Sequence, residues 1–164
     1  MDEVEAQLEI TPVEPPNGRY NGKLDDKGRL KLPVVFQTYL AGIPEKGLFV
    51  TSIDRSTAQI YPKAAWRANL KMLREQRDAQ KQFAKTVLFN AQDFGADAEM
   101  DNQGRITLNS YLRDKLNMDG QGLHLYWEDG HISLFTEEIY QKRLEASLAN
   151  TIEAVDAMQG AGLQ

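Results

Sequence analysis

Two aspartate-to-arginine patterns are the part of this sequence best equipped for chemistry. They read Asp-Asp-Lys-Gly-Arg at residues 25–29 and Asp-Asn-Gln-Gly-Arg at residues 101–105. A guanidinium group is planar and always charged, so it can hold a phosphate, or the O6 and N7 atoms of guanine, through paired hydrogen bonds. An aspartate four residues earlier can accept backbone N–H groups and hold the chain in a turn. The patterns therefore indicate recognition of an anion.

The sequence offers little for catalysis or for binding a metal. It has no cysteine, and His124 and His131 stand apart from any Ser-His-Asp set or metal-ligand spacing. We therefore expect no enzyme, no metal, no cofactor and no small-molecule substrate. The lack of cysteine fits a reducing compartment, and no apolar run predicts a signal peptide or a membrane partner, so we expect a cytoplasmic protein.

Each pattern leads directly into a predicted strand. Gly28 and Gly104 can supply the positive φ that closes a tight reversal. After each arginine, apolar and polar residues alternate with the period of two that is typical of a half-buried strand. Arg29 and Arg105 are then expected to point outward. The residues expected to face the core are Leu30, Leu32, Ile106 and Leu108.

Both patterns belong to an internal repeat. Asp25 and Asp101 lie 76 positions apart, and the offset shrinks to 74 at Tyr61 and Phe135. In each copy the pattern predicts a short helix after the second strand and then a hairpin, which gives four strands and one helix per copy. A unit of about fifty residues buries little apolar surface, so the two copies are expected to share one core.

Charge is unevenly distributed along the chain. The net charge is −5, but residues 17–92 carry +8 and residues 93–164 carry −8. The stretch 62–90 lacks glycine and predicts one or two helices, with bases at intervals of three and four. These bases are Lys63, Arg67, Lys71, Arg74, Arg77, Lys81 and Lys85. They form a solvated helix face, a DNA contact or a surface for an acidic neighbour.

Four motifs, taken together and in order, resemble the MraZ family of transcriptional regulators. They are L-D-D-K-G-R-L-K-L-P at 24–33, I-D-R at 53–55, Y-P-K-A-A-W at 61–66 and M-D-N-Q-G-R-I at 100–106. The resemblance implies an α+β, mostly β fold of two tandem SpoVT/AbrB-like units. These units would form a swapped-hairpin-type, double-psi-like β-barrel, with helices between and after the copies.

The resemblance also implies an organisation and a function. The expected parts are an acidic tail at 1–17, a first unit at 18–62, a helical connector at 63–93, a second unit at 94–145 and a C-terminal tail at 146–164. The expected function is sequence-specific binding of double-stranded DNA by a homo-oligomeric ring, associated with the nucleoid. Its targets would be G-rich promoter repeats, and its effect would be repression of a division and cell-wall gene cluster.

The family's Asp-x-x-x-Arg signature falls on both patterns of this sequence. The candidate DNA-binding residues are Arg29, Arg105, Lys27, Lys31, Lys23 and Arg19. The candidate turn-organising residues are Asp25, Asp101, Gly28 and Gly104. The alternative is that each Asp–Arg pair only closes its own turn as an exposed ion pair, which is typically worth less than about 1 kcal/mol.

Some residues depart from the family's pattern. Asn17 stands where the family has an arginine, Asn109 replaces a proline, and residues 90–98 form a longer segment. Residues 19–31 carry a net +3 and residues 95–107 a net −2, so the first copy is expected to dominate DNA contact.

Two other functions remain open at this point. One is a ring-forming structural or interaction protein whose DNA surface has decayed and whose acidic second half docks a protein. The other is a DNA-binding partner of the antitoxin kind, although antitoxins of related fold usually carry a single unit and a toxin-binding tail. The basic residues gathered on one turn and strand of the first copy favour DNA binding.

Overall fold

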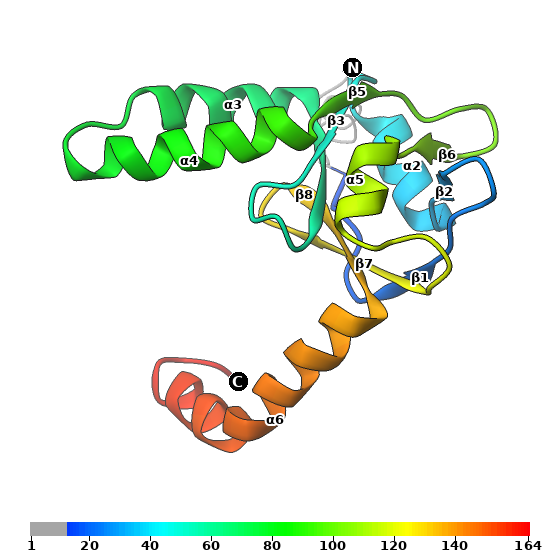
Figure 1. The fold of residues 1–164 in the computed structure, drawn as a ribbon. Helices are drawn as coiled ribbons and strands as arrows, with labels where there is room; N and C mark the ends of the chain where they lie inside the picture. The colour runs from blue at the N-terminus through cyan, green and yellow to red at the C-terminus, as the bar shows by residue number, and fades with distance from the viewer. Residues whose placement is uncertain (1–12) are drawn as a thin grey trace, which may run out of the picture.

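The strands of the two copies are interleaved. The computed structural model describes residues 13–164, so most of the predicted acidic tail at 1–17 lies outside the described residues. The first copy contains β1 (Tyr20–Gly22), β2 (Arg29–Lys31), α2 (Val34–Gly42), β3 (Leu48–Thr51) and β4 (Ala58–Pro62). The second contains β5 (Ala96–Ala98), β6 (Arg105–Thr107), α5 (Ser110–Lys115), β7 (Leu123–Glu128) and β8 (His131–Thr136). Helices α3 (Lys63–Arg74) and α4 (Ala79–Phe94) connect the copies, and α6 (Glu137–Gly160) follows them (Figure 1).

Strand pairing exchanges the first strand of each copy. The six-stranded antiparallel sheet has the order β1-β7-β8-β4-β3-β5, so β1 pairs with the hairpin of the second copy and β5 with the hairpin of the first. Strands β2 and β6 pair with each other in a separate two-stranded sheet. The predicted α+β class is confirmed, whereas closure of the sheets into a barrel stays a prediction.

The register of the sheets repeats under the same offset as the sequence. Tyr20 pairs with Leu125 in β1–β7, and the equivalent Ala96 pairs with Val50 in β5–β3. Leu30 pairs with its own counterpart Ile106 at the centre of the β2–β6 ribbon. The two copies are therefore related by an approximate two-fold axis that passes through the ribbon.

One hydrophobic core serves both copies. Leu30, Leu32, Ile106 and Leu108 are all at most 1% exposed, which confirms the predicted inward face of the two ribbon strands. They pack in one cluster with side chains of the hairpins and of the helices α2 and α5. Because neither copy completes its sheet alone, folding of one copy depends on the other.

The connector forms two helices, α3 and α4, where the sequence predicted one or two. Trp66 of α3 stacks on Phe49 at 4.8 Å between ring centroids and lies 5.0 Å from Tyr61, which anchors the helix to the large sheet. Arg55 in the β3–β4 loop donates to Asn90 and Asp93 of α4. These contacts explain two of the motifs, at 53–55 and 61–66, as supports of the helical arm.

The last helix is longer than the predicted tail helix. Helix α6 begins at Glu137, so the boundary expected between 145 and 146 falls inside it. Thr136 caps its start by accepting from Ile139 N, and no glycine or proline interrupts residues 137–159, so nothing local stops the helix. Asn150 departs from helical φ and ψ and marks a kink that divides α6 into two helical segments (Figure 1), and none of the residues of α6 is buried.

Interleaving predicts a single unfolding transition for both copies. The sequence provides two natural reporters, Trp66 beside the first hairpin and Trp127 in β7 of the second copy. Single-tryptophan variants, Trp127→Phe and Trp66→Phe, should show coincident urea midpoints by fluorescence. Leu30→Ala should lower the free energy of unfolding by about 3 kcal/mol at both reporters, whereas exposed Val34→Ala should change it little. Separate midpoints for the two reporters would contradict the shared core.

Candidate nucleic-acid interface

The first Asp–Arg pattern forms a turn closed by the aspartate. One carboxylate oxygen of Asp25 accepts from the backbone N–H of Lys27 and of Arg29, each at 2.9 Å. The other accepts from Arg29 Nε at 2.7 Å. Asp25 thus fixes both the backbone entering β2 and the direction of the guanidinium group.

The second pattern repeats this geometry. Asp101 accepts from the backbone N–H of Gln103 and of Arg105, each at 2.9 Å, and from Arg105 Nε at 2.8 Å. Within residues 13–164, the Nη atoms of Arg29 and Arg105 have no hydrogen-bond partner. Their side chains are 27% and 23% exposed. Each guanidinium is therefore oriented at Nε and open to a ligand at its outer edge.

These bonds stabilise the ionised aspartates. The pKa of Asp25 is lowered to about 2, mainly because the backbone N–H of Arg29 donates to the carboxylate. The side chain of Arg29 adds to the effect. The pKa of Asp101 is also lowered, chiefly by the backbone N–H of Arg105. Both pairs therefore remain ionic at neutral pH.

The two glycines of the turns are positions of close approach. Gly28 has φ of 74° and Gly104 has φ of 75°. A Cβ on Gly28 would lie 2.5 Å from Nε of Arg113, and a Cβ on Gly104 would lie 2.1 Å from Cδ of Gln37. Larger side chains would therefore be strained in conformation and would displace a neighbour.

Gln37 and Arg113 are positioning residues that sequence reasoning did not identify. Gln37 Nε2 donates to Leu32 O at 2.7 Å, and Arg113 Nε donates to Leu108 O at 3.1 Å. Each side chain extends from the helix of one copy across the turn glycine of the other. The signal for them was available, because the two residues are 76 positions apart, as the turns are.

Strand pairing gathers the basic residues on the outer face of the ribbon. In the β2–β6 register, Arg29 lies opposite Thr107 and Lys31 lies opposite Arg105. The two arginines are diagonal neighbours, a relation that places Cα atoms about 7–8 Å apart in antiparallel sheets. Two like charges directly opposite each other, as at Lys31 and Arg105, are unfavourable unless an anion joins them. The ribbon thus presents a compact cationic face.

This arrangement bears on the expected asymmetry between the two copies, which stays a prediction. At positions equivalent to Lys23, Lys27 and Lys31, the second copy has Glu99, Gln103 and Thr107. The expected dominance of the first copy came from charge counted along each segment. Pairing, however, places Lys31 of the first copy opposite Arg105. Arg105 therefore has a neighbouring base that its own segment lacks. Lys23 and Lys27 are exposed in the first copy.

Arg19 is placed in a different cluster. Its Nη1 contacts His124 Nδ1 at 2.7 Å, and its guanidinium lies 4.9 Å from the centre of the Tyr140 ring. His124 also contacts Glu137 and stacks on Tyr140 at 4.2 Å. This cluster joins β1, β7 and the start of α6, so the contacts of Arg19 and His124 are structural ones.

The departure at Asn109 has a local explanation. The side chain of Asn109 caps α5 by accepting from Leu112 N at 2.8 Å, and it donates to Phe94 O at 3.0 Å. Proline at the equivalent position 33 can do neither. The asparagine therefore secures the shorter helix of the second copy to the end of α4.

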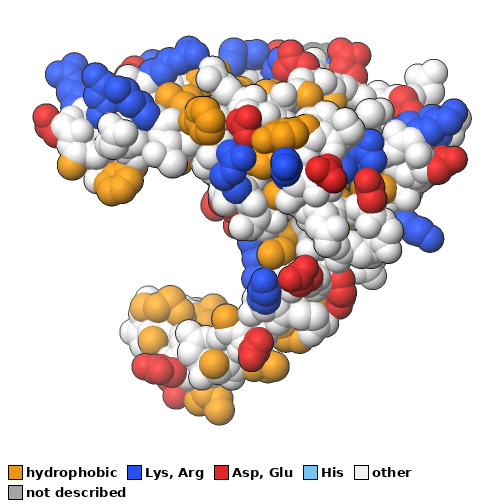
Figure 2. Space-filling model, in the orientation of Figure 1, with side chains coloured by type: hydrophobic (Ala, Val, Ile, Leu, Met, Phe, Trp, Pro, Cys, Tyr) orange, Lys and Arg blue, Asp and Glu red, His pale blue; other side chains and the backbone are white. Residues whose placement is uncertain are grey.

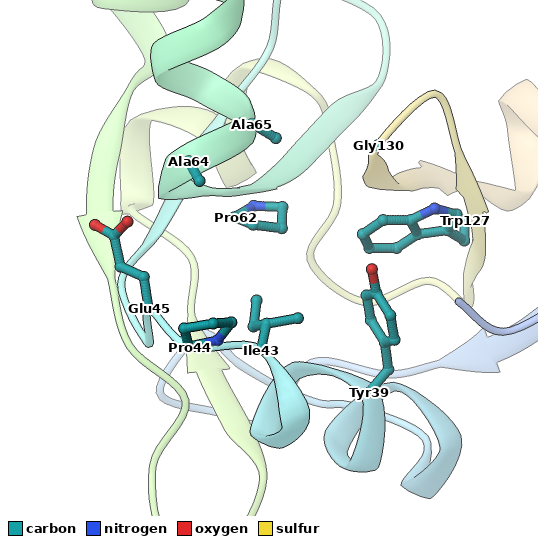
Figure 3. A pocket seen from close by; sticks show the side chains of 9 residues that line it. All are labelled: Tyr39, Ile43, Pro44, Glu45, Pro62, Ala64, Ala65, Trp127 and Gly130. Carbon is teal, nitrogen blue, oxygen red and sulfur yellow. The ribbon is translucent and has the colours of Figure 1, made fainter. Parts of the chain in front are cut away.

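An apolar groove lies away from the ribbon. It has a volume of about 440 Å³ and is lined by Tyr39, Ile43, Pro44, Glu45, Pro62, Ala64, Ala65, Trp127 and Gly130 (Figure 3). Its one carboxylate, Glu45, is paired with Arg67.

Across residues 13–164, no cluster of three or more His, Cys, Asp or Glu side chains could hold a metal ion. In the same range, no helix has the length and apolar character needed to cross a membrane.

Comparison with known proteins finds relatives named transcriptional regulator MraZ. The chain is 28% identical over 131 residues to the protein of Acidobacterium capsulatum, which is 78% of this chain and 86% of that one. It is 30% identical over 108 residues to the protein of Koribacter versatilis, 63% of this chain and 71% of that one. It is 38% identical over 93 residues to the protein of Mycobacterium tuberculosis, 57% of this chain and 62% of that one. No model of a known protein family matches the chain.

The Asp–Arg turns predict a specific acid response. Because the carboxyl pKa values are depressed in the folded protein, the turns contribute stability above the ordinary value of 3.8 and lose it as pH falls through the folded value, about 2 for Asp25. The double variant Asp25→Asn with Asp101→Asn should have a lower urea midpoint at pH 6 and a shallower decline between about pH 4 and pH 2. The exposed neighbour Asp26→Asn should follow the parent. A parallel decline in the double variant would show that the turns do not depend on ionisation.

The turn glycines predict a graded loss of stability. Gly104→Ala should cost about 2 kcal/mol, because positive φ is strained and Gln37 must leave its bond to Leu32. The matched control is Gly120→Ala, which has φ of 79° but open space around the new methyl group. It should cost about 1 kcal/mol by chemical denaturation. Equal losses would mean that the close approach of Gln37 contributes nothing.

Proposed function

This chain belongs to the MraZ family of transcriptional regulators, and from that premise we propose that it binds double-stranded DNA through the β2–β6 ribbon. The observation that carries the proposal is the placement of two arginines on one outer face. Both are held at Nε by an aspartate and have Nη atoms without a partner in the described chain. A two-stranded ribbon fits the major groove of B-DNA, where guanine presents O6 and N7 to such a group.

The bases around the arginines complete the proposed site. Lys27 lies in the turn at the Arg29 end of the ribbon, and Lys31 lies beside Arg105 near the other end. Lysine contacts to phosphates add affinity without reading sequence, through release of counterions from the DNA. Lys23 extends the same cationic surface, whereas Arg19 contributes through the β1–α6 junction.

The finer parts of the proposal follow from the family resemblance. The DNA targets are G-rich promoter repeats upstream of a division and cell-wall gene cluster, and the effect is repression. The active form is a homo-oligomeric ring in the cytoplasm, associated with the nucleoid. Family membership agrees with the prediction that the chain is not an enzyme.

The first test removes one arginine at a time. Arg29→Ala and Arg105→Ala should each weaken binding to a G-rich promoter duplex by about 1–3 kcal/mol, measured by fluorescence anisotropy. Lys142→Ala removes the same charge from α6, away from the ribbon, and should leave affinity unchanged. If both arginine variants bind as the parent does, the ribbon is not the interface. If the intact protein binds no genomic fragment, docking of a protein partner replaces DNA binding.

A second test restores the missing base of the second copy. Thr107 is the exposed equivalent of Lys31 and lies opposite Arg29. Thr107→Lys should tighten DNA binding and steepen its dependence on salt by about one unit of the logarithmic slope. Thr107→Gln, which adds length without charge, is the control. Equal salt slopes for parent and Thr107→Lys would show that this side of the ribbon does not meet phosphate.

A further inference from the structure

Helix α6 carries exposed apolar residues that nothing within residues 13–164 covers. Ile152 is 80% exposed and Leu148 is 69% exposed, and the helix runs out from the end of β8 (Figure 1). Hydrophobic side chains gather on this segment (Figure 2). Asn150 departs from helical φ and ψ and marks a kink, so the exposed apolar residues fall into two groups: Leu144 and Leu148 before it, and Ile152, Val155 and Met158 after it. At 100° per residue the three members of the second group, the apolar stripe, share one face. A contiguous apolar surface of this kind is typical of an interaction site.

The outer half of α6 is also purely acidic. Residues 144–164 contain Glu145, Glu153 and Asp156 and no lysine or arginine. Within the segment after the kink, helical spacing places Asp156 at one border of the apolar stripe. The occupant that covers this stripe must therefore offer an apolar strip with basic residues beside it.

Helix α3 provides such a strip. Ala64, Ala68 and Met72 are exposed and share one face, and Ala64 continues the apolar groove of Figure 3. No acidic residue occurs between 63 and 74, and bases border this face. Lys63 is paired with Asp97 and Arg67 with Glu45, which leaves Lys71 and Arg74 without an ion pair among residues 13–164. Small side chains would let a second helix approach closely, and the bordering bases match the acids of α6.

The chain's own α6 is directed away from this surface. Tyr140 stacks on His124 at 4.2 Å, and the guanidinium of Arg143 lies over Phe135 at 4.6 Å. These contacts fix the first turns of α6 on β7 and β8, and the helix leaves the body in a different direction from the α3–α4 arm (Figure 1). Two α6 helices facing each other would bring like charges together. A second chain's α3 meets both requirements.

We infer that the last segment of α6, residues 151–160, docks on the Ala64–Met72 face of α3 in a second copy of this chain. The inference deepens the proposed homo-oligomer, on which it rests, and is independent of DNA binding. The two docking surfaces differ, so the contact is heterologous and closes into a ring when the rotation between copies allows it. It gives the basic stripe of the connector an acidic neighbour.

The first test measures mass in solution without DNA. The parent should be an oligomer by light scattering, and Ile152→Asp with Val155→Asp should reduce it to a single chain of 18.5 kDa. Val34→Asp, at a 73% exposed position on α2, should leave the mass unchanged. A parent of one-chain mass, or an oligomer that survives both α6 substitutions, overturns the inference.

Charge reversal identifies the partner surface. Lys71→Glu with Arg74→Glu should dissociate the oligomer, and so should Glu153→Lys with Asp156→Lys. All four changes in one chain should restore it. Failure of the combined variant to reassemble, while its circular dichroism matches that of the parent, contradicts the pairing of α3 with α6.

Cross-linking distinguishes between the possible occupants. The protein has no cysteine, so new ones react alone. Chains with Ala68→Cys mixed with chains carrying Thr151→Cys should form a disulfide-linked dimer, and neither chain alone should do so efficiently. A dimer from Thr151→Cys alone indicates α6–α6 pairing, and a link within a chain carrying both cysteines indicates folding back. Either result overturns the inference, and neither affects the proposed DNA interface.

Discussion

The antiparallel pairing of β2 with β6 is the constraint on which the rest of the site depends. Each strand has only three residues, and its inner side chains, Leu30 and Ile106, are fully buried. Because the strands run in opposite directions, the two Asp–Arg turns lie at opposite ends of the ribbon. Alternation then leaves both arginines on the outer face. Loss of this pairing would separate the arginines and open the core that both copies share.

The sequence predicted local structure well because the pattern of each element occurs twice, once in each copy of the repeat. The hairpin strands, the strand after each turn and the buried alternation at Leu30 and Ile106 all follow from period and turn chemistry. It did not predict which strands exchange partners in detail, since pairing between residues as distant as Tyr20 and Leu125 leaves no local signal. The same limit hid Lys31 beside Arg105. The expected dominance of the first copy in DNA contact stays a prediction.

Side chains that act across the copies were also beyond local reasoning. Gln37 and Arg113 each extend from one copy over the turn glycine of the other. From the sequence they are unremarkable polar residues on short helices. The length of α6 was misjudged for a different reason: without a glycine or proline between 137 and 159, only tertiary contacts decide where a surface helix ends. Among the described residues, the helix continues to Gly160 with a kink at Asn150.

Duplication within one chain allows equivalent positions to differ, which identical subunits cannot do. Lys27 and Gln103 occupy the same place in the two turns, as do Lys31 and Thr107 in the two strands. The ribbon therefore keeps a two-fold backbone but has a charge pattern that is not two-fold, because the first copy supplies the extra lysine at each end, Lys27 in the turn before Arg29 and Lys31 opposite Arg105.

The small size of the ribbon argues for action by several copies. One ribbon offers two arginines and a few lysines, and phosphate contacts of this number are strongly weakened by salt. An assembly that holds several ribbons at fixed distances makes each later contact intramolecular, which raises total affinity without any new contact to DNA. It also requires targets that repeat at a matching distance. The proposed α6–α3 contact would hold the ribbons at fixed distances, and the proposed repeats would place the DNA sites at matching distances.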